Sequence, residues 1–191
     1  FLLQGLEKLE YRGYDSAGIT TIEGNHLFTK KAKGRLQNLK DLLKDENVLG
    51  HVGIGHTRWA THGIPSNLNS HPHTNNDETI SLVHNGIIEN YRELKEILIL
   101  QGYQFHSETD SEVAAALLNH YYKGDPKEAI KKTVSKLKGT FALVILFEDQ
   151  PDVIYSVRNV SPIVATICKE GAMLASDLTA LCRFTNEYFV V

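Results

Sequence analysis

Several features that mark large classes of proteins are missing from this sequence. No apolar run approaches the roughly 18 residues that a membrane helix needs, so we expect no membrane association. The 20 basic residues do not outnumber the 23 acidic ones and form no basic block, which argues against a nucleic-acid partner. Residues 1–5 lack the basic region and the cleavage site of a signal peptide, so we expect a cytoplasmic location.

Cysteine and the common catalytic motifs are also scarce. The two cysteines, Cys168 and Cys182, sit in apolar segments, and we expect both to be buried thiols in a reducing compartment. There is no H-E-x-x-H or C-x-x-C zinc motif, no phosphate-binding glycine loop and no G-x-S-x-G elbow. We therefore expect no metal and no cofactor, and no side chain in the sequence stands out as an activated nucleophile.

The apolar pattern predicts more strands than helices. Helices are predicted over residues 1–10, 35–44, 90–102, 126–137, a stretch that follows 107–110, and a short turn after Asp177; strands are predicted over 19–22, 26–31, 51–56, 79–83, 140–147, 153–157, 163–167, 173–175 and 189–191. Because several strands are joined by short turns, we expect one α+β domain with largely antiparallel sheets.

The densest polar stretch is His56-Thr57-Arg58-Trp59-Ala60-Thr61-His62-Gly63, which follows a predicted strand. The Arg58 guanidinium can bind a carboxylate through two hydrogen bonds, and the nearby hydroxyl and imidazole groups can add donors. Trp59 can shield such a site from water. An ion-paired surface arginine beside a half-buried tryptophan remains the simpler alternative.

Asp110 and the pair Asn85-Gly86 are the other candidates for binding. Asp110 stands at the predicted start of a helix, where it is either an N-cap or an acceptor for a ligand ammonium group. Asn85-Gly86 is predicted to end a strand in a turn, and its amide and backbone N–H can also face a developing oxyanion. A carboxylate grip and an ammonium grip together would describe a site for an α-amino acid.

Six of the nine histidines lie in one segment: His51, His56, His62, His71, His73 and His84. Such a cluster invites a zinc site, yet it carries no acidic ligand at helical spacing. We therefore do not predict a metal centre here.

Five motifs occur in a familiar order and spacing. They are Tyr11-Arg12-Gly13-Tyr14-Asp15-Ser16-Ala17-Gly18, His56 to Gly63, His71-Pro72-His73, His84-Asn85-Gly86-Ile87-Ile88-Glu89-Asn90 and Ser107-Glu108-Thr109-Asp110. On these motifs the chain resembles the glutaminase domain, a class II glutamine amidotransferase, of the glucosamine-6-phosphate synthases. The resemblance implies an N-terminal-nucleophile hydrolase fold, which is a four-layer αββα sandwich with mainly antiparallel sheets.

The resemblance also implies a role for each matching residue. Arg58, Thr61 and His62 would bind the glutamine α-carboxylate, and Asp110 would bind the α-amino group. Asn85 and Gly86 would form the oxyanion hole. Trp59 would belong to a loop that closes over glutamine, and Arg12 and Gly13 would border the nucleophile. The histidine cluster would then support the loop and the site. The partner molecule implied is L-glutamine, with no metal and no cofactor.

In the family, a cysteine at the mature N-terminus attacks the glutamine amide, and its own α-amino group serves as the base. The ammonia passes to a sugar-phosphate isomerase domain and aminates fructose 6-phosphate. This sequence begins inside the first helix, after the family's Cys-Gly strand. We therefore expect residues 1–191 to be one glutaminase domain truncated at both ends, inactive alone, from a homodimeric parent enzyme.

Two alternatives stay open at this stage. One is the glutaminase domain of another N-terminal-cysteine amidotransferase, of the amidophosphoribosyltransferase type. The other is a catalytically dead module that binds glutamine without hydrolysing it, since no cysteine here matches the nucleophile position.

Overall fold

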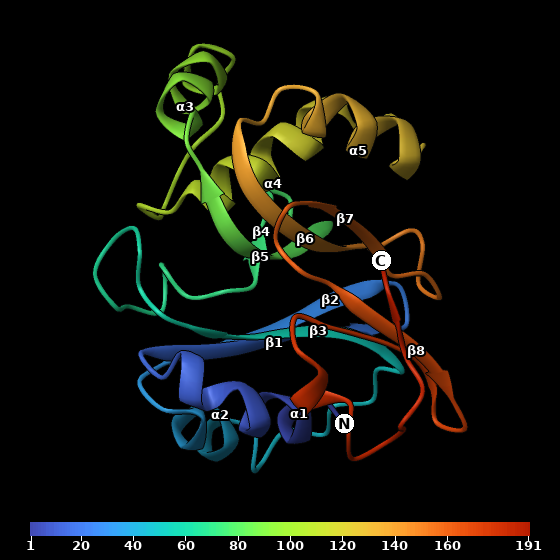
Figure 1. Ribbon diagram of the computed structural model, residues 1–191. Helices are drawn as coiled ribbons and strands as arrows, with labels where there is room; N and C mark the ends of the chain where they lie inside the picture. Colours follow the sequence, from blue (N-terminus) through green and yellow to red (C-terminus); the bar gives the residue numbers. More distant parts are fainter.

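The computed structural model describes residues 1–191 (Figure 1). The helical elements are α1 (Leu2–Leu9), η1 (Glu10–Arg12), α2 (Leu36–Leu42), α3 (Tyr91–Leu100), α4 (Asp110–Tyr121), α5 (Pro126–Val134) and η2 (Leu178–Ala180). The strands are β1 (Ser16–Glu23), β2 (His26–Lys33), β3 (Val52–Arg58), β4 (His73–Thr74), β5 (Ile80–Ile88), β6 (Gly139–Phe147), β7 (Tyr155–Asn159), β8 (Val164–Cys168), β9 (Gly171–Ala175) and β10 (Phe189–Val190).

Two sheets lie one above the other, with helices on both outer faces (Figure 1). The sheet of order β2-β1-β3 is covered by α1 and α2, and the sheet of order β4-β5-β6-β7 is covered by α4 with α3 and α5 beside it. Every strand pairing is antiparallel. The predicted α+β class and αββα layering are therefore confirmed. A small third sheet, β10-β8-β9, was not foreseen as a separate unit.

The layer between the two sheets changes character along the strands. Its apolar part is a small cluster of four buried side chains, Ile22, Ile54, Val83 and Leu146. Since side chains alternate along a strand, Ile54, His56 and Arg58 share one face of β3, while Val83 and Asn85 share one face of β5. The interface between the sheets thus begins as a hydrophobic core and continues as a polar site.

Three local predictions are confirmed by where the helices and strands begin and end. The predicted hairpin is present as β1 and β2, and Gly24 turns it with a φ of 63°. Pro126 is the first residue of α5, where its missing N–H costs nothing. The Asp177 carboxylate accepts a hydrogen bond from the backbone N–H of Thr179 and so caps η2.

The predicted turn at Asn85-Gly86 is wrong, because β5 continues through both residues. Asn85 lies opposite Ala142 and Gly86 opposite Phe141 in the ladder with β6. Gly86 has a φ of 127°, and a Cβ placed on it would come within 2.0 Å of the Thr140 carbonyl oxygen. Pairing with a distant strand has overridden the local preference of an Asn-Gly pair for a turn.

Two helix starts differ in detail from the expectation. Thr109, not Asp110, caps α4 by accepting a hydrogen bond from Glu112 N, and Asp110 is the first helical residue. Asn90 does precede α3, but its side chain makes no cap bond. Instead it binds the Lys136 carbonyl and the Lys138 N–H at 2.9 Å each, because the adjacent chain offers a matching pair of backbone groups.

The expectation that both cysteines are buried is wrong. Cys168 is half-buried and Cys182 is exposed, and neither forms a disulfide. Cys168 ends β8 at the edge of the molecule, where no helix covers the hairpin of β8 and β9 (Figure 1). Leu42 of α2 and Ile97 of α3 are each 46% exposed although both are apolar, because each helix buries only a narrow stripe of its surface.

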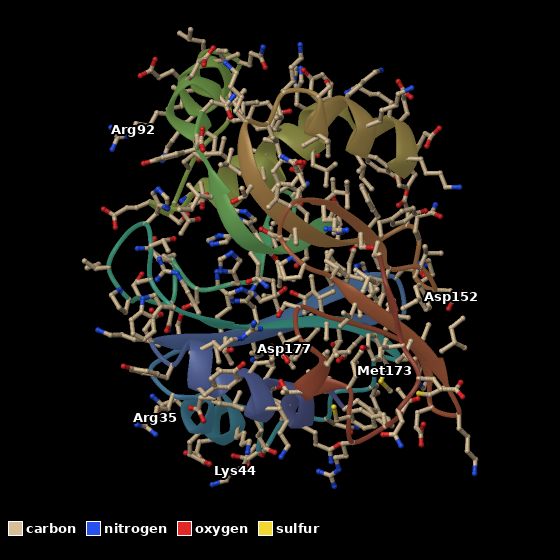
Figure 2. All side chains as sticks on the ribbon, in the orientation of Figure 1. Arg35, Lys44, Arg92, Asp152, Met173 and Asp177 are labelled. Carbon is tan, nitrogen blue, oxygen red and sulfur yellow. The ribbon has the colours of Figure 1, made fainter.

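Charged side chains occupy the outer surface of the sandwich. Figure 2 shows Arg35, Lys44 and Arg92 pointing away from the layers, and all three are exposed. None of the helices has the length and apolarity needed to cross a membrane.

We predict that Gly139→Ala destabilises the fold more than Gly124→Ala. Both glycines have a positive φ, 112° and 90°, so alanine is strained by about 1–2 kcal/mol at either position. A Cβ on Gly139 would also come within 2.2 Å of the Ile87 carbonyl, whereas nothing lies within 4 Å at Gly124. Urea unfolding should show a further loss of about 1–3 kcal/mol for Gly139→Ala, and equal losses would contradict the packing argument.

Candidate active site

A cavity of about 410 Å³ opens where the layer between the sheets becomes polar. Most of the residues predicted to form a site line it: Arg12, Arg58, Trp59, Thr61, Asn85, Gly86 and Asp110. The two others lie directly behind this lining. A Cβ on Gly13 would come within 2.7 Å of the Arg58 backbone, and the His62 ring lies 4.0 Å from the Asp110 carboxylate.

Arg58 is the last residue of β3 and is buried. Its Nη2 donates to the carbonyl oxygens of His62 and Gly63, so the loop after β3 folds back over the guanidinium. Its Nη1 lies 3.8 Å from Asp15 Oδ1 and makes no hydrogen bond within the protein. Burial lowers the pKa of Arg58, and the carboxylates of Asp15 and Asp110 oppose that effect. The arrangement leaves one buried cationic donor without a hydrogen-bond acceptor.

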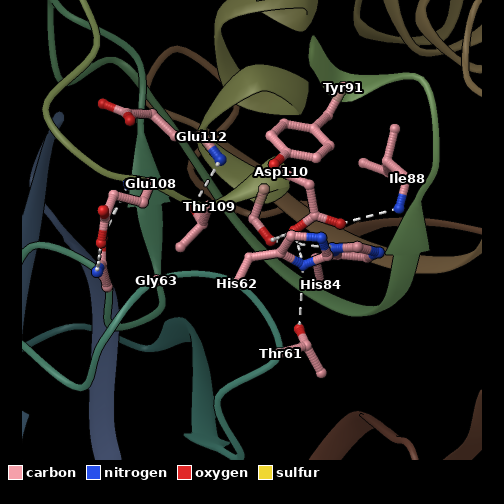
Figure 3. A network of polar contacts seen from close by, with 12 residues as sticks. Thr61, His62, Gly63, His84, Ile88, Tyr91, Glu108, Thr109, Asp110 and Glu112 are labelled. Atoms are coloured by element: carbon pink, nitrogen blue, oxygen red, sulfur yellow. Dashed lines mark hydrogen bonds and ion pairs between the residues drawn. The ribbon is translucent and has the colours of Figure 1, made fainter.

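Asp110 begins α4, and its two carboxylate oxygens have different partners (Figure 3). Oδ2 accepts a hydrogen bond of 2.8 Å from the backbone N–H of Ile88. Oδ1 lies 3.8 Å from His84 Nδ1 and 4.0 Å from His62 Nδ1. A carboxylate at a helix N-terminus is stabilised as an anion, so Asp110 presents negative charge to the cavity.

Asn85 projects from β5 toward β3 and is held there by one contact. Its Oδ1 lies 2.9 Å from His56 Nε2, while its Nδ2 makes no hydrogen bond within the protein. Gly86 follows it along the cavity wall. The side chain thus offers an amide N–H group at the cavity.

Four imidazoles surround these groups, and burial lowers the pKa of each: His56, His71, His73 and His84. His71 Nε2 and His84 Nδ1 each lie 2.9 Å from the Ser111 hydroxyl, which also donates to Asp110 Oδ1 at 3.4 Å. Because the hydroxyl has one proton and two lone pairs, it can accept from both rings while it donates to the carboxylate. The His56 and His71 rings are stacked with their centroids 4.3 Å apart. Neutral imidazoles do not compete with a ligand for the charge of Asp110.

The mouth of the cavity is formed by Arg12 and Trp59. Arg12 donates to the Ser176 hydroxyl at 2.7 Å and lies 3.5 Å from Asp177, so one segment far away in sequence fixes its position. Trp59 is 60% exposed and meets the Tyr14 ring edge-on at 5.4 Å. Its indole therefore lies at the opening and not in the core.

Three residues that organise this site were not among the predicted site residues. Asp15 pairs with Arg58 and also accepts a hydrogen bond from the backbone N–H of Ala60. Ser111 joins His71 to His84. His56 holds Asn85. Asp15 and His56 lie within the quoted motifs, but their contacts depend on chain segments 29 to 45 positions away.

The chemistry that this arrangement permits is specific. A buried cation and a helix-terminal carboxylate on one cavity match the two charges of an α-amino acid. The free amide of Asn85 suits an oxygen that gains negative charge. Neither Cys168 nor Cys182 lines the cavity.

Comparison with known proteins adds an independent line of evidence. The family described as "Glutamine amidotransferase domain" matches residues 56–183. The chain is 50% identical over 190 residues to the glutamine–fructose-6-phosphate aminotransferase (isomerizing) of Clostridium tetani, and 50% identical over 187 residues to that of Thermotoga maritima. These matches cover 100% and 97% of this chain, which spans 31% of the length of each relative.

Solved structures agree with this assignment of the fold. The chain aligns with a TM-score of 0.79 to the glutamine phosphoribosylpyrophosphate amidotransferase of Bacillus subtilis, at 28% identity, covering 94% of this chain and 39% of that one. It aligns with a TM-score of 0.82 to a structure titled as the allosteric regulatory enzyme of purine biosynthesis, also at 28% identity, covering 95% and 40%. The predicted N-terminal-nucleophile hydrolase fold is thereby confirmed.

The buried imidazoles predict a specific acid sensitivity. Burial lowers the pKa of His73 well below 6.5, so below about pH 6.5 the unfolded chain binds a proton that the folded chain excludes, and stability falls as pH falls. His73→Gln removes that group. Its acid slope between pH 6.5 and 5 should be shallower than that of the wild type by up to about 1.4 kcal/mol per pH unit in urea unfolding.

The control is His51→Gln, at an exposed position in the same histidine-rich segment. Its slope should match that of the wild type. A slope for His73→Gln that equals the wild-type slope would contradict the buried neutral state.

Proposed function

Because this chain belongs to the glutamine amidotransferase domain family, we propose that it is the glutamine-hydrolysing part of a glutamine–fructose-6-phosphate aminotransferase. The observation that carries this function is the placement of the Arg58 cation, the Asp110 carboxylate and the Asn85 amide on one cavity. The 50% identity to relatives of that name supports this acceptor over others.

In this function L-glutamine enters as a zwitterion. Its α-carboxylate accepts hydrogen bonds from Arg58 Nη1, with Thr61 and His62 beside it, and its α-ammonium group donates to Asp110. His84 remains neutral because burial lowers its pKa, so the charge of Asp110 stays available to the ligand. The loop that carries Trp59 closes the cavity and shields both ion pairs from water.

Hydrolysis of the side-chain amide then follows from the geometry. The thiolate of the family's N-terminal cysteine attacks the amide carbon, after its proton passes to the adjacent α-amino group. The carbonyl oxygen becomes an oxyanion and accepts hydrogen bonds from Asn85 Nδ2 and the backbone N–H of Gly86. Collapse of this intermediate breaks the C–N bond, the leaving nitrogen takes the proton as ammonia, and water hydrolyses the thioester to glutamate.

Arg12 and Gly13 border the position of that cysteine. Gly13 allows close approach because its backbone packs directly on the Arg58–Trp59 peptide. Arg12 is fixed by Ser176 and Asp177 and keeps one wall of the cavity cationic. These contacts favour the thiolate form of a nearby cysteine.

The remaining features of the function concern the whole protein. We propose that residues 1–191 form one glutaminase domain, and that the ammonia passes to a sugar-phosphate isomerase domain in the same polypeptide. There it converts fructose 6-phosphate into glucosamine 6-phosphate. The proposed parent is a cytoplasmic homodimer.

The structural likeness to glutamine phosphoribosylpyrophosphate amidotransferase supports a second candidate, in which the ammonia goes to a phosphoribosyl acceptor. The lower identity, 28% against 50%, makes it the weaker one. Incubation of the full-length protein with glutamine and either fructose 6-phosphate or phosphoribosylpyrophosphate separates the two, because only the true acceptor is aminated.

The decisive experiment measures glutamate release from L-glutamine by the full-length protein, including its cysteine-glycine segment. We expect release, and no release when that cysteine is replaced by alanine. Calorimetry with glutamine in parallel distinguishes the non-catalytic module, which would bind glutamine and release no glutamate.

Arg58→Lys in the same protein should raise KM for glutamine at least about tenfold and leave kcat nearly unchanged. Lysine keeps the charge but loses the planar fork that grips a carboxylate. Arg92→Lys, on the exposed face of α3, is the matched control and should behave as the wild type (Figure 2). A change in kcat alone would contradict the carboxylate assignment.

A further inference from the structure

His56 and Asn85 join the two facing sheets at the edge of the cavity. His56 projects from β3 and Asn85 from β5, with 2.9 Å between Nε2 and Oδ1. This is the one hydrogen bond that the Asn85 side chain makes within the protein. His56 thus holds Asn85 from the facing sheet.

An asparagine amide has two ends of nearly equal size and opposite hydrogen-bonding character. With Oδ1 toward His56, the NH₂ group faces the cavity and can stabilise an oxyanion. If the amide turned over, Oδ1 would face that oxygen and repel its developing charge. The value of Asn85 to catalysis therefore depends on what holds its orientation.

The state of His56 makes it suited to this task. Burial lowers its pKa to about 4, so the ring is neutral and carries one N–H. Nε2 lies against the acceptor Oδ1 of Asn85, whereas Nδ1 has no hydrogen-bond partner, so the single N–H is best placed on Nε2. Stacking on His71, at 4.3 Å between centroids and an interplanar angle of 32°, restricts rotation of the ring.

A neutral donor also has an electrostatic advantage at this position. A cation here would attract the oxygen of Asn85 but would also repel Arg58, which belongs to the same face of β3. The imidazole donates without adding charge to the cavity.

We propose that His56 is a positioning residue, which donates from Nε2 to Asn85 Oδ1 and so keeps the Asn85 NH₂ group aimed at the oxyanion, a role that rests on the proposed glutaminase function. Its ring lies on the cavity wall beside Asn85. Its contribution passes through Asn85 alone.

The test compares His56→Leu with His56→Gln in the full-length protein, with glutamate release as the measurement. Leucine removes the donor, so kcat should fall about 10- to 100-fold while KM for glutamine stays within about threefold. Glutamine reaches to the position of Nε2 with an N–H group, so His56→Gln should retain most of kcat. Equal losses in the two variants would overturn the proposal, because a missing donor cannot then be the cause.

A double-mutant cycle with Asn85→Ala separates positioning from a general structural role. Asn85→Ala alone should lower kcat by about 10²–10³-fold. His56→Leu added to Asn85→Ala should change kcat by less than about twofold, since the orientation of an absent amide no longer matters. A further tenfold loss in the double variant would show that His56 acts by another route and would overturn the inference.

The outcomes also separate this inference from the proposed function. A wild-type protein that releases no glutamate overturns both, whereas normal release by His56→Leu overturns the positioning role alone. Thermal unfolding of each variant accompanies the assays. Should His56→Leu fail to fold, His56→Met, which is unbranched and adapts to irregular space, carries the same expectation for kcat and for the cycle.

Discussion

The packing of β3 against β5 is the contact on which the rest of this structure depends. Ile54 and Val83 exclude water from one part of it, and two residues further along, His56 and Asn85 meet through a hydrogen bond. The two-residue repeat of a strand places both pairs on the same face, so the apolar contact sets the distance at which the polar one forms. Without it, residues that belong to two different sheets would not share a cavity.

The charge distribution in the cavity depends on the histidine side chains remaining neutral. Arg58 and Asp110 are the charged groups proposed to bind the two ends of the amino acid, and burial lowers the pKa of the imidazoles around them, which favours their neutral form. Charges in a site of low dielectric interact more strongly than in water. A protonated imidazole would therefore compete with the ligand's ammonium group for Asp110 and would repel Arg58. Hydroxyl groups, such as that of Ser111, form hydrogen bonds with the imidazole rings without adding charge.

Helix α4 connects this chemistry to the main hydrophobic core. Asp110 and Ser111 stand at its first turn, and Val113, Ala114 and Leu117 farther along it are buried against the sheet. This anchored helix fixes the Asp110 carboxylate, which accepts hydrogen bonds from the backbone N–H of Ile88 at 2.8 Å and from the Ser111 hydroxyl at 3.4 Å. The stability of the core and the precision of the site are thus properties of one element.

Local sequence was enough to predict the hairpin of β1 and β2 and the proline start of α5, because turn chemistry and helix-start preferences are encoded within short stretches. The αββα layering and the set of residues that gather at the cavity were predicted from the resemblance of five motifs to a known family. Other features required the tertiary structure. Asn85-Gly86 has the local pattern of a turn, and it became mid-strand because β6, more than fifty residues later, pairs with it. The ion-pair partner of Arg58 and the hydrogen-bond partners of Asn85 and His84 come from distant segments. The exposure of Cys168 and Cys182 depends on which faces the layers leave uncovered. The sequence by itself determined which side chains are available for the site, and only the folded arrangement decided their orientation and charge, because hydrogen-bond geometry and desolvation depend on neighbours in space.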